Sequence, residues 1–108
     1  MDSGGKTPEE LETLLEDALL LSDPQAVARL FDDGSILITA DGALRLCGRD
    51  DTLRFAAMLC EKGQCYLADP RSVFQARDTA LLIGDGIINV ARRSHDGSWR
   101  FAIALLPL

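Results

Sequence analysis

Residues 87–106 read IINVARRSHDGSWRFAIALL, and this stretch decides the fold class. Two runs rich in β-branched, aromatic and other apolar residues flank His95-Asp96-Gly97-Ser98, whose residue types accept tight or left-handed turn geometry. The pattern predicts an antiparallel hairpin of strands 87–93 and 99–106, the last two strands of a sheet.

The last predicted strand has one bulky face and one small face, because successive side chains point to opposite sides of a sheet. A small face either accepts a close neighbour or leaves a hollow beneath helices. The chain stays apolar on both faces from Ala104 to Leu108, which indicates an association surface and a homodimer through the sheet. The bulky face is expected to hold Trp99, Phe101, Ile103 and Leu105, and the small face Arg100, Ala102, Ala104 and Leu106.

Further strands are expected upstream of this hairpin, at residues 35–39, 43–47, 72–77 and 79–83. Asp41-Gly42 is a strong signal for the hairpin turn between the first two. Arg77-Asp78 and Gly84-Asp85-Gly86 are also turn sequences, so the later strands should pair as an antiparallel meander. No crossover helix separates them, which argues against a parallel sheet.

Three helices are expected to precede the meander. Thr7-Pro8-Glu9-Glu10 forms a capping box with Pro at the first helical position, and an apolar stripe of helical period follows it. A second helix is expected from Pro24 to Phe31, and a third from Gly48 to Gly63. Residues 1–6, rich in Gly and Ser, are expected to be a disordered lead-in to a single domain over residues 7–108.

Composition excludes several classes of partner. The chain has 108 residues and a formal net charge of −6, and its arginines are scattered, so we expect it to bind neither nucleic acid nor an anionic membrane surface. No apolar run approaches the ~20 residues that span a bilayer, so a cytoplasmic location is expected. His95 is the one histidine, and Cys47, Cys60 and Cys65 lack zinc-site spacing, so we expect buried free thiols and neither metal nor cofactor.

Five short motifs follow one another along the chain, namely Ser22-Asp23-Pro24, Leu30-Phe31-Asp32-Asp33-Gly34-Ser35-Ile36, Gly48-Arg49-Asp50-Asp51, Asp78-Thr79-Ala80-Leu81 and Asp96-Gly97-Ser98-Trp99-Arg100. In this order and spacing they resemble the SnoaL-like branch of the nuclear transport factor two-like superfamily. That resemblance implies a cystatin-like, cone-shaped α+β fold, in which N-terminal helices pack on a curved, mostly antiparallel sheet. It also implies a pocket between the concave face and the helices, and frequent homodimers.

The resemblance also implies where catalytic groups of the isomerases and cyclases would fall. The carboxylate base corresponds to Thr39, which cannot act as a base at neutral pH. Asp41, two residues on, is the alternative base, or else part of the turn. The tyrosine donor corresponds to Leu15, and the neutral acid of the oxyanion site to Asn89, whose amide could donate.

The remaining polar residues on strands are candidates for ligand contacts. Gln75 and Arg77 enter the pocket together if their face is concave, and otherwise they face solvent, as Arg45 also could. The first functional hypothesis is binding of a small apolar molecule without a complete catalytic set, with Thr39, Gln75, Arg77 and Asn89 as ligand contacts. The alternatives are an isomerase, cyclase or dehydratase acting on an apolar carbonyl compound, and a non-catalytic dimerisation module.

Overall fold

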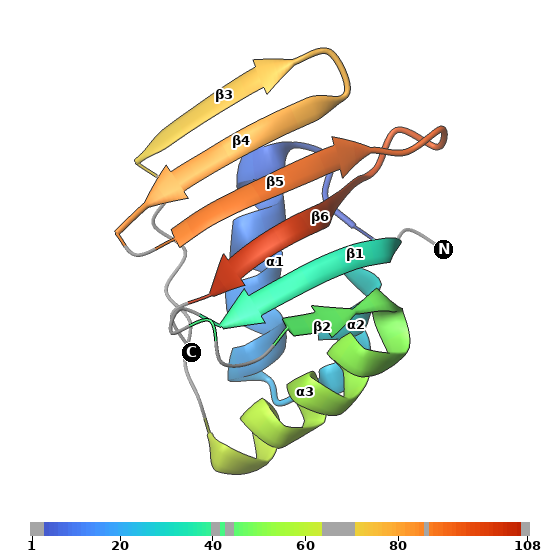
Figure 1. Ribbon diagram of the computed structural model, residues 1–108, viewed down its shortest axis with the longest axis vertical. Coiled ribbons are helices and arrows are strands. Elements are labelled where there is room, and N and C mark those ends of the chain that lie inside the picture. The colour runs from blue at the N-terminus through green and yellow to red at the C-terminus, as the bar shows by residue number, and fades with distance from the viewer. Residues whose placement is uncertain (1–3, 40–41, 43–44, 64–70, 86, 107–108) are drawn as a thin grey trace.

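The computed structural model describes residues 4–39, 42, 45–63, 71–85 and 87–106. These residues form helices packed on one mixed sheet, with strand order β2-β1-β6-β5-β4-β3 (Figure 1). The predicted α+β class is confirmed. The elements are α1 (Pro8–Leu20), α2 (Pro24–Arg29), β1 (Phe31–Thr39), β2 (Arg45–Cys47), α3 (Gly48–Lys62), β3 (Ser72–Ala76), β4 (Thr79–Gly84), β5 (Ile87–Arg93) and β6 (Trp99–Leu106).

The pairing of the strands follows the turn sequences, with one addition. The β3-β4-β5-β6 meander and the β1–β2 hairpin are antiparallel, as predicted. β1 also pairs with β6, and this pair is parallel. Local sequence does not predict this contact, because β1 and β6 are far apart along the chain and no turn sequence connects them.

Helix starts agree with the capping signals. Thr7 Oγ1 accepts a hydrogen bond from the Glu10 backbone N–H at 3.1 Å, and Asp23 Oδ1 accepts one from Ala26 N–H at 3.1 Å. α2 ends earlier than predicted, because Phe31 already belongs to β1 and its ring packs 5.1 Å from that of Phe101, centroid to centroid.

The core lies between the sheet and α1, which crosses behind the strands in Figure 1. Leu11 and Leu15 of α1 are fully buried, as the apolar period predicts. α3 packs against α2 and β1, beside the β2 edge of the sheet. The inner face of the sheet contributes large side chains that are also fully buried, namely Phe31, Leu37, Leu82, Trp99 and Phe101.

A β-bulge in β6 overturns the expected alternation of its side chains. Val90 pairs with Ile103, but the next residue of β5 pairs with Phe101, so Ala102 is the extra residue. The bulge shifts the alternation by one position. Phe101 and Ala104 therefore both face the core, whereas Ile103 is 44% exposed on the outer face.

The N-terminal segment adds a short contact to the sheet. Gly5 lies in the lead-in expected from the sequence, yet its N–H donates to the Trp99 carbonyl at 2.9 Å and its carbonyl accepts from Trp99 N–H at 2.7 Å. Gly4 has a φ of +93°, and a Cβ there would lie 2.4 Å from the Trp99 carbonyl oxygen. Glycine is thus required where the chain passes Trp99.

Candidate functional site

A buried carboxyl–amide pair joins α1 to β5. Asn89 is 0% exposed and Glu12 is 1% exposed. Asn89 Nδ2 donates to Glu12 Oε1 at 2.7 Å, and Asn89 Oδ1 accepts from the Leu105 N–H at 3.1 Å. Both ends of the amide are therefore engaged, which fixes its orientation in the interior.

Glu12 reaches the interior because of its place on the helix. It lies three residues before Leu15 and seven before Leu19, both buried, so all three share one face of α1. The sequence analysis missed Glu12, although its position on the apolar stripe was a usable signal. Burying a carboxyl group is costly unless it is hydrogen-bonded, and Asn89 supplies such a bond.

The pair could take part in proton-transfer or oxyanion chemistry. A carboxyl group can accept or hold a proton, and an amide N–H can donate to a developing oxyanion. In this structure, however, the Asn89 amide donates to Glu12 itself. A substrate oxygen would have to replace that contact.

The isomerase pattern includes two further described residues, Thr39 and Leu15, and Leu15 shares a face of α1 with Glu12. Thr39 is buried at the end of β1. Asn89 of β5 is in register with Ala104 of β6, which is in register with Leu37 of β1, and Thr39 lies two residues beyond Leu37. Leu15 is fully buried and has no proton to donate. Asp41 lies outside the residues that the structure describes.

Gln75, Arg77 and Arg45 lie at the edges of the sheet, far from the interior pair. Gln75 is exposed on edge strand β3, and its Nε2 donates to the Arg77 carbonyl at 3.2 Å. Arg77 is exposed in the β3–β4 turn, and Arg45 is exposed on β2. The structure therefore does not bring these side chains to Asn89, and their role in ligand binding stays a prediction.

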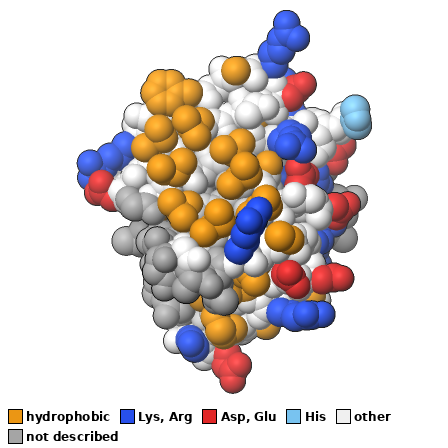
Figure 2. Space-filling model, in the orientation of Figure 1, with side chains coloured by type: hydrophobic (Ala, Val, Ile, Leu, Met, Phe, Trp, Pro, Cys, Tyr) orange, Lys and Arg blue, Asp and Glu red, His pale blue; other side chains and the backbone are white. Residues whose placement is uncertain are grey.

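The outer face of the sheet is apolar over most of its width. Hydrophobic side chains gather over the strands in Figure 2, on the side opposite α1. Phe74 is 61% exposed and Ile88 is 51% exposed. Cross-strand partners form two rows, one of Phe74, Leu81, Val90, Ile103 and Ile36, and the other of Ile83, Ile88, Leu105 and Ile38.

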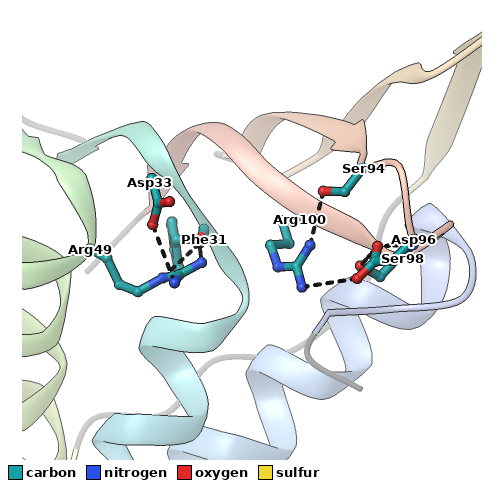
Figure 3. A network of polar contacts seen from close by, with 7 residues as sticks. All are labelled: Phe31, Asp33, Arg49, Ser94, Asp96, Ser98 and Arg100. Atoms are coloured by element: carbon teal, nitrogen blue, oxygen red, sulfur yellow. Dashed lines mark hydrogen bonds and ion pairs between the residues drawn. The ribbon is translucent and has the colours of Figure 1, made fainter. Parts of the chain in front are cut away.

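Polar contacts border this apolar face. Arg92 of β5 lies opposite Arg100 of β6 in the strand register. The Nη1 atom of Arg92 lies 3.8 Å from Asp32 Oδ2. Arg100 Nη1 donates to Ser94 Oγ at 2.9 Å and its Nη2 lies 3.7 Å from Asp96 Oδ2 (Figure 3). The hydroxyl and backbone N–H of Ser98 donate to the Asp96 carboxylate and lower its pKa.

A second group of contacts in Figure 3 ties α3 to β1. Arg49 donates to the Phe31 carbonyl at 3.0 Å from Nη2 and 3.3 Å from Nε, and its Nη1 lies 3.2 Å from Asp33 Oδ1. These contacts hold the irregular part of β1, where the register with β6 shifts between Phe31 and Ile36. Their role is structural.

A polar depression of about 640 Å³ lies beside the β5–β6 hairpin, where His95 is an exposed turn residue. Arg93 lies 2.6 Å from Asp78 and places its guanidinium 5.4 Å from the Trp99 ring centroid. Arg92 and Arg93, which both line the depression, each already pair with a carboxylate.

The cysteines differ from the buried thiols expected. Cys47 is exposed, Cys60 is only partly buried, and Cys65 lies outside the described residues. Burial, and to a smaller extent the charge of Asp23, raise the pKa of the Cys60 thiol. Among the described residues, no cluster of His, Cys, Asp or Glu could hold a metal ion, and no helix is long and apolar enough to cross a membrane.

No protein-family model matches the sequence, and no curated protein matches it significantly. Solved structures do match its fold. A protein from Thiobacillus denitrificans, assigned as a calcium/calmodulin-dependent protein kinase type II association domain, has a TM-score of 0.76 and 21% identity, with 97% of this chain and 98% of that chain covered.

Two further structures share the fold at slightly lower TM-scores and coverage. A ketosteroid isomerase-like protein from Erwinia carotovora atroseptica has a TM-score of 0.74 and 18% identity, with 90% of this chain and 89% of that chain covered. A protein from Streptomyces avermitilis, assigned as a dehydratase of the NTF2-like family, has a TM-score of 0.70 and 22% identity, with 89% and 88% covered. Identities this low show a shared fold alone.

Proposed function

We propose that this chain, whose fold is that of the nuclear transport factor two-like superfamily, is a non-catalytic self-association module that forms a homodimer through its outer sheet face. The observation that carries the proposal is the pair of apolar rows on that face, with Phe74 and Ile88 more than half exposed. Contiguous apolar surface of this kind is unfavourable in water and is typical of association surfaces.

The apolar rows are large enough to form the centre of a dimer contact, though not the whole of it. The apolar rows cross five of the six strands, namely β3, β4, β5, β6 and β1. At ~4.8 Å between strands they span about 19 Å, and two rows of alternate residues cover about 13 Å along the strands, or roughly 250 Å² in projection. A standard interface buries about 800 Å² per partner. The rows therefore supply the apolar centre of the contact, and residues around them, including Arg92, supply its polar rim.

A second copy is the simplest occupant. Two identical apolar faces complement one another across a two-fold axis without any other surface. One structural neighbour is assigned as an association domain, which agrees with this role. The interior agrees as well, because its large side chains are fully buried and its polar pair is internally hydrogen-bonded.

Variants on the outer face test the proposal. Ile88→Asp and Ile103→Asp each place a charge at the centre of the face, and each should convert the dimer to a monomer in size-exclusion chromatography with light scattering. Leu20→Asp is the matched control, since Leu20 is equally apolar and 74% exposed but lies on α1. Dissociation by Leu20→Asp alone would contradict the proposal.

The second candidate function is binding of a small apolar carbonyl compound in the interior, with or without isomerase, cyclase or dehydratase chemistry. The observation that favours it is a buried carboxyl group, Glu12, hydrogen-bonded to the buried amide of Asn89. Asn89 would donate to the carbonyl oxygen and Glu12 would move a proton, with no cofactor. Asp41 as base, Thr39 as a contact and a cytoplasmic location stay predictions.

Thermal-shift measurements with cyclic ketones distinguish the two candidates. A ligand that binds only the folded state raises the unfolding temperature by mass action. Interior binding predicts a rise for the wild type that Asn89→Leu abolishes, while dimerisation is unaffected. The absence of any rise with saturating ketone would remove this candidate and leave the dimer proposal intact.

A further inference from the structure

A hollow between α1 and α2 combines an apolar floor with one acidic and one basic side chain. Its volume is about 270 Å³. It lies on the helices and is separate from the Glu12–Asn89 pair and from the outer sheet face. Asp17 and Arg29 are among the residues that line it, and the rest of its lining is Gly4, Leu14, Ala18, Leu21, Ala26 and Leu30.

Asp17 occupies an unfavourable position for an acid. It lies in the last turn of α1, where the backbone carbonyls form the negative end of the helix dipole, and that turn contains no basic residue. Within the described part of the chain, neither Asp17 nor Arg29 forms an ion pair. Both are exposed at the hollow. A cation beside Asp17 would relieve the unfavourable arrangement.

We propose that this hollow binds a small zwitterion with an aliphatic side chain, of the chemical class of the branched α-amino acids. The ammonium group lies at Asp17 and at the carbonyl end of α1, and the carboxylate pairs with the Arg29 guanidinium, whose planar fork suits it. The side chain packs on Leu14, Leu21 and Leu30. A hollow at the lower end of ligand-pocket volumes suits a molecule of this size.

Ligands with a single charge fit the hollow less well. An aliphatic carboxylate would pair with Arg29 but leave Asp17 beside its apolar chain. An aliphatic amine would pair with Asp17 but place a second positive charge near Arg29. Only the zwitterion complements both Asp17 and Arg29. The experiment therefore compares the affinity of a zwitterion with the affinities of ligands that carry one charge.

The experiment titrates the full-length protein with four probes, followed by amide chemical shifts in NMR spectra. L-leucine carries both charges, leucinamide only the ammonium, 4-methylpentanoate only the carboxylate, and glycine lacks the aliphatic side chain. L-leucine should bind at α1 and α2 with a Kd on the order of 1 mM. Leucinamide and 4-methylpentanoate should each bind about two- to fivefold more weakly, as expected for one exposed ion pair, and glycine should not bind.

Two variants assign the charges individually. Asp17→Asn should remove the preference for L-leucine over 4-methylpentanoate, because the ammonium group then has no acidic partner. Arg29→Gln should remove the preference for L-leucine over leucinamide, because the carboxylate then has no basic partner. Glu9→Gln, which changes an exposed acid in the first turn of α1, should change neither preference. No saturable shift with L-leucine, equal binding of a single-charge probe to the wild type, or variants that weaken all probes equally would overturn the proposal.

Discussion

At the scale of single residues, Asn89 connects three elements with one side chain. Its amide contacts Glu12 on α1 and the backbone of Leu105 on β6, while its own backbone pairs within β5. Buried polar groups of this kind stabilise a fold only while every partner is present. Ser35 illustrates the opposite case, since its Oγ is buried without a hydrogen-bond partner in the described structure.

Replacing Asn89 by Ala should lower the free energy of unfolding by about 2–4 kcal/mol, because a buried carboxyl group and a buried N–H each lose a hydrogen bond and a cavity forms. Urea denaturation measures the change. Gln75→Ala, at an exposed strand position, should change stability by less than about 0.5 kcal/mol. Equal effects of the two substitutions would show that the interior pair contributes nothing.

Ser35→Ala should behave differently from Asn89→Ala. Ser35 is 1% exposed and its hydroxyl has no hydrogen-bond partner among the described residues, so removing the hydroxyl leaves no partner unsatisfied. We expect unchanged or higher stability, by up to about 1 kcal/mol, in the same denaturation assay. A loss above about 1 kcal/mol would mean that the hydroxyl is hydrogen-bonded in solution.

The Asp96 carboxylate should show a pH response set by Ser98. The hydrogen bonds from Ser98 lower the pKa of Asp96 below its ordinary 3.8 in the folded state. The contribution of the Asp96 carboxylate to stability is therefore fully present above pH 3.8, and it is lost as the pH falls through the lower pKa that Asp96 has in the folded state. NMR titration of the side-chain carboxyl carbon should show the Asp96 pKa rising part of the way towards 3.8 in Ser98→Ala, which removes the hydroxyl but keeps the backbone N–H. An unchanged pKa would exclude the hydroxyl hydrogen bond as a cause of the lowered value.

At the scale of elements, local sequence predicted most boundaries because caps and turns are encoded by adjacent residues. Thr7 caps α1 and Asp23 caps α2 through their own side chains, and Asp96-Gly97 forms the last turn. The bulge at Ala102 and the parallel β1–β6 pair were not predictable in this way. Both features depend on residues that are distant in sequence. A bulge also interrupts the alternation of side chains from which the two faces of a strand are predicted.

The candidate site was also predicted only in part from the sequence. The superfamily resemblance placed Asn89 at a functional position, and the structure finds it buried in the interior. Its partner Glu12 was missed because charged residues on helices usually face solvent, and the resemblance contains no acid there. The outer apolar face was expected from residues Ala104 to Leu108, but the exposed side chains belong mainly to β3, β5 and Ile103.

The contact between the N-terminal segment and β6 predicts a strong effect at Gly4. Gly4→Ala should destabilise the protein by about 1–3 kcal/mol, because the φ of +93° is strained for alanine and its Cβ would collide with the Trp99 carbonyl. Gly34→Ala is the matched control, since a Cβ added at Gly34 would meet no other atom within 4 Å. Thermal unfolding of both variants measures the difference, and equal midpoints would contradict the contact.

At the scale of the whole molecule, the proposed dimer couples folding to association. The chain packs its large inner side chains against α1 and leaves the opposite sheet face apolar and exposed. Each copy carries a net charge of −6, so two copies repel one another at low ionic strength. An apolar contact must exceed that repulsion, and salt should therefore strengthen the dimer.

A coupled dimer predicts that stability depends on protein concentration. The unfolding temperature of the wild type should rise as the protein is concentrated, because association stabilises the folded state by mass action. Ile88→Asp should remove this dependence, since it prevents association. Calorimetry at several concentrations measures both, and a wild-type midpoint independent of concentration would argue for a monomer.

The central claim is that the outer sheet face is covered by a second copy, and sedimentation equilibrium of the wild type tests it most directly. The chain mass is 11.7 kDa, so a homodimer predicts twice that mass at high concentration and physiological salt. A mass of 11.7 kDa at every concentration would contradict the account.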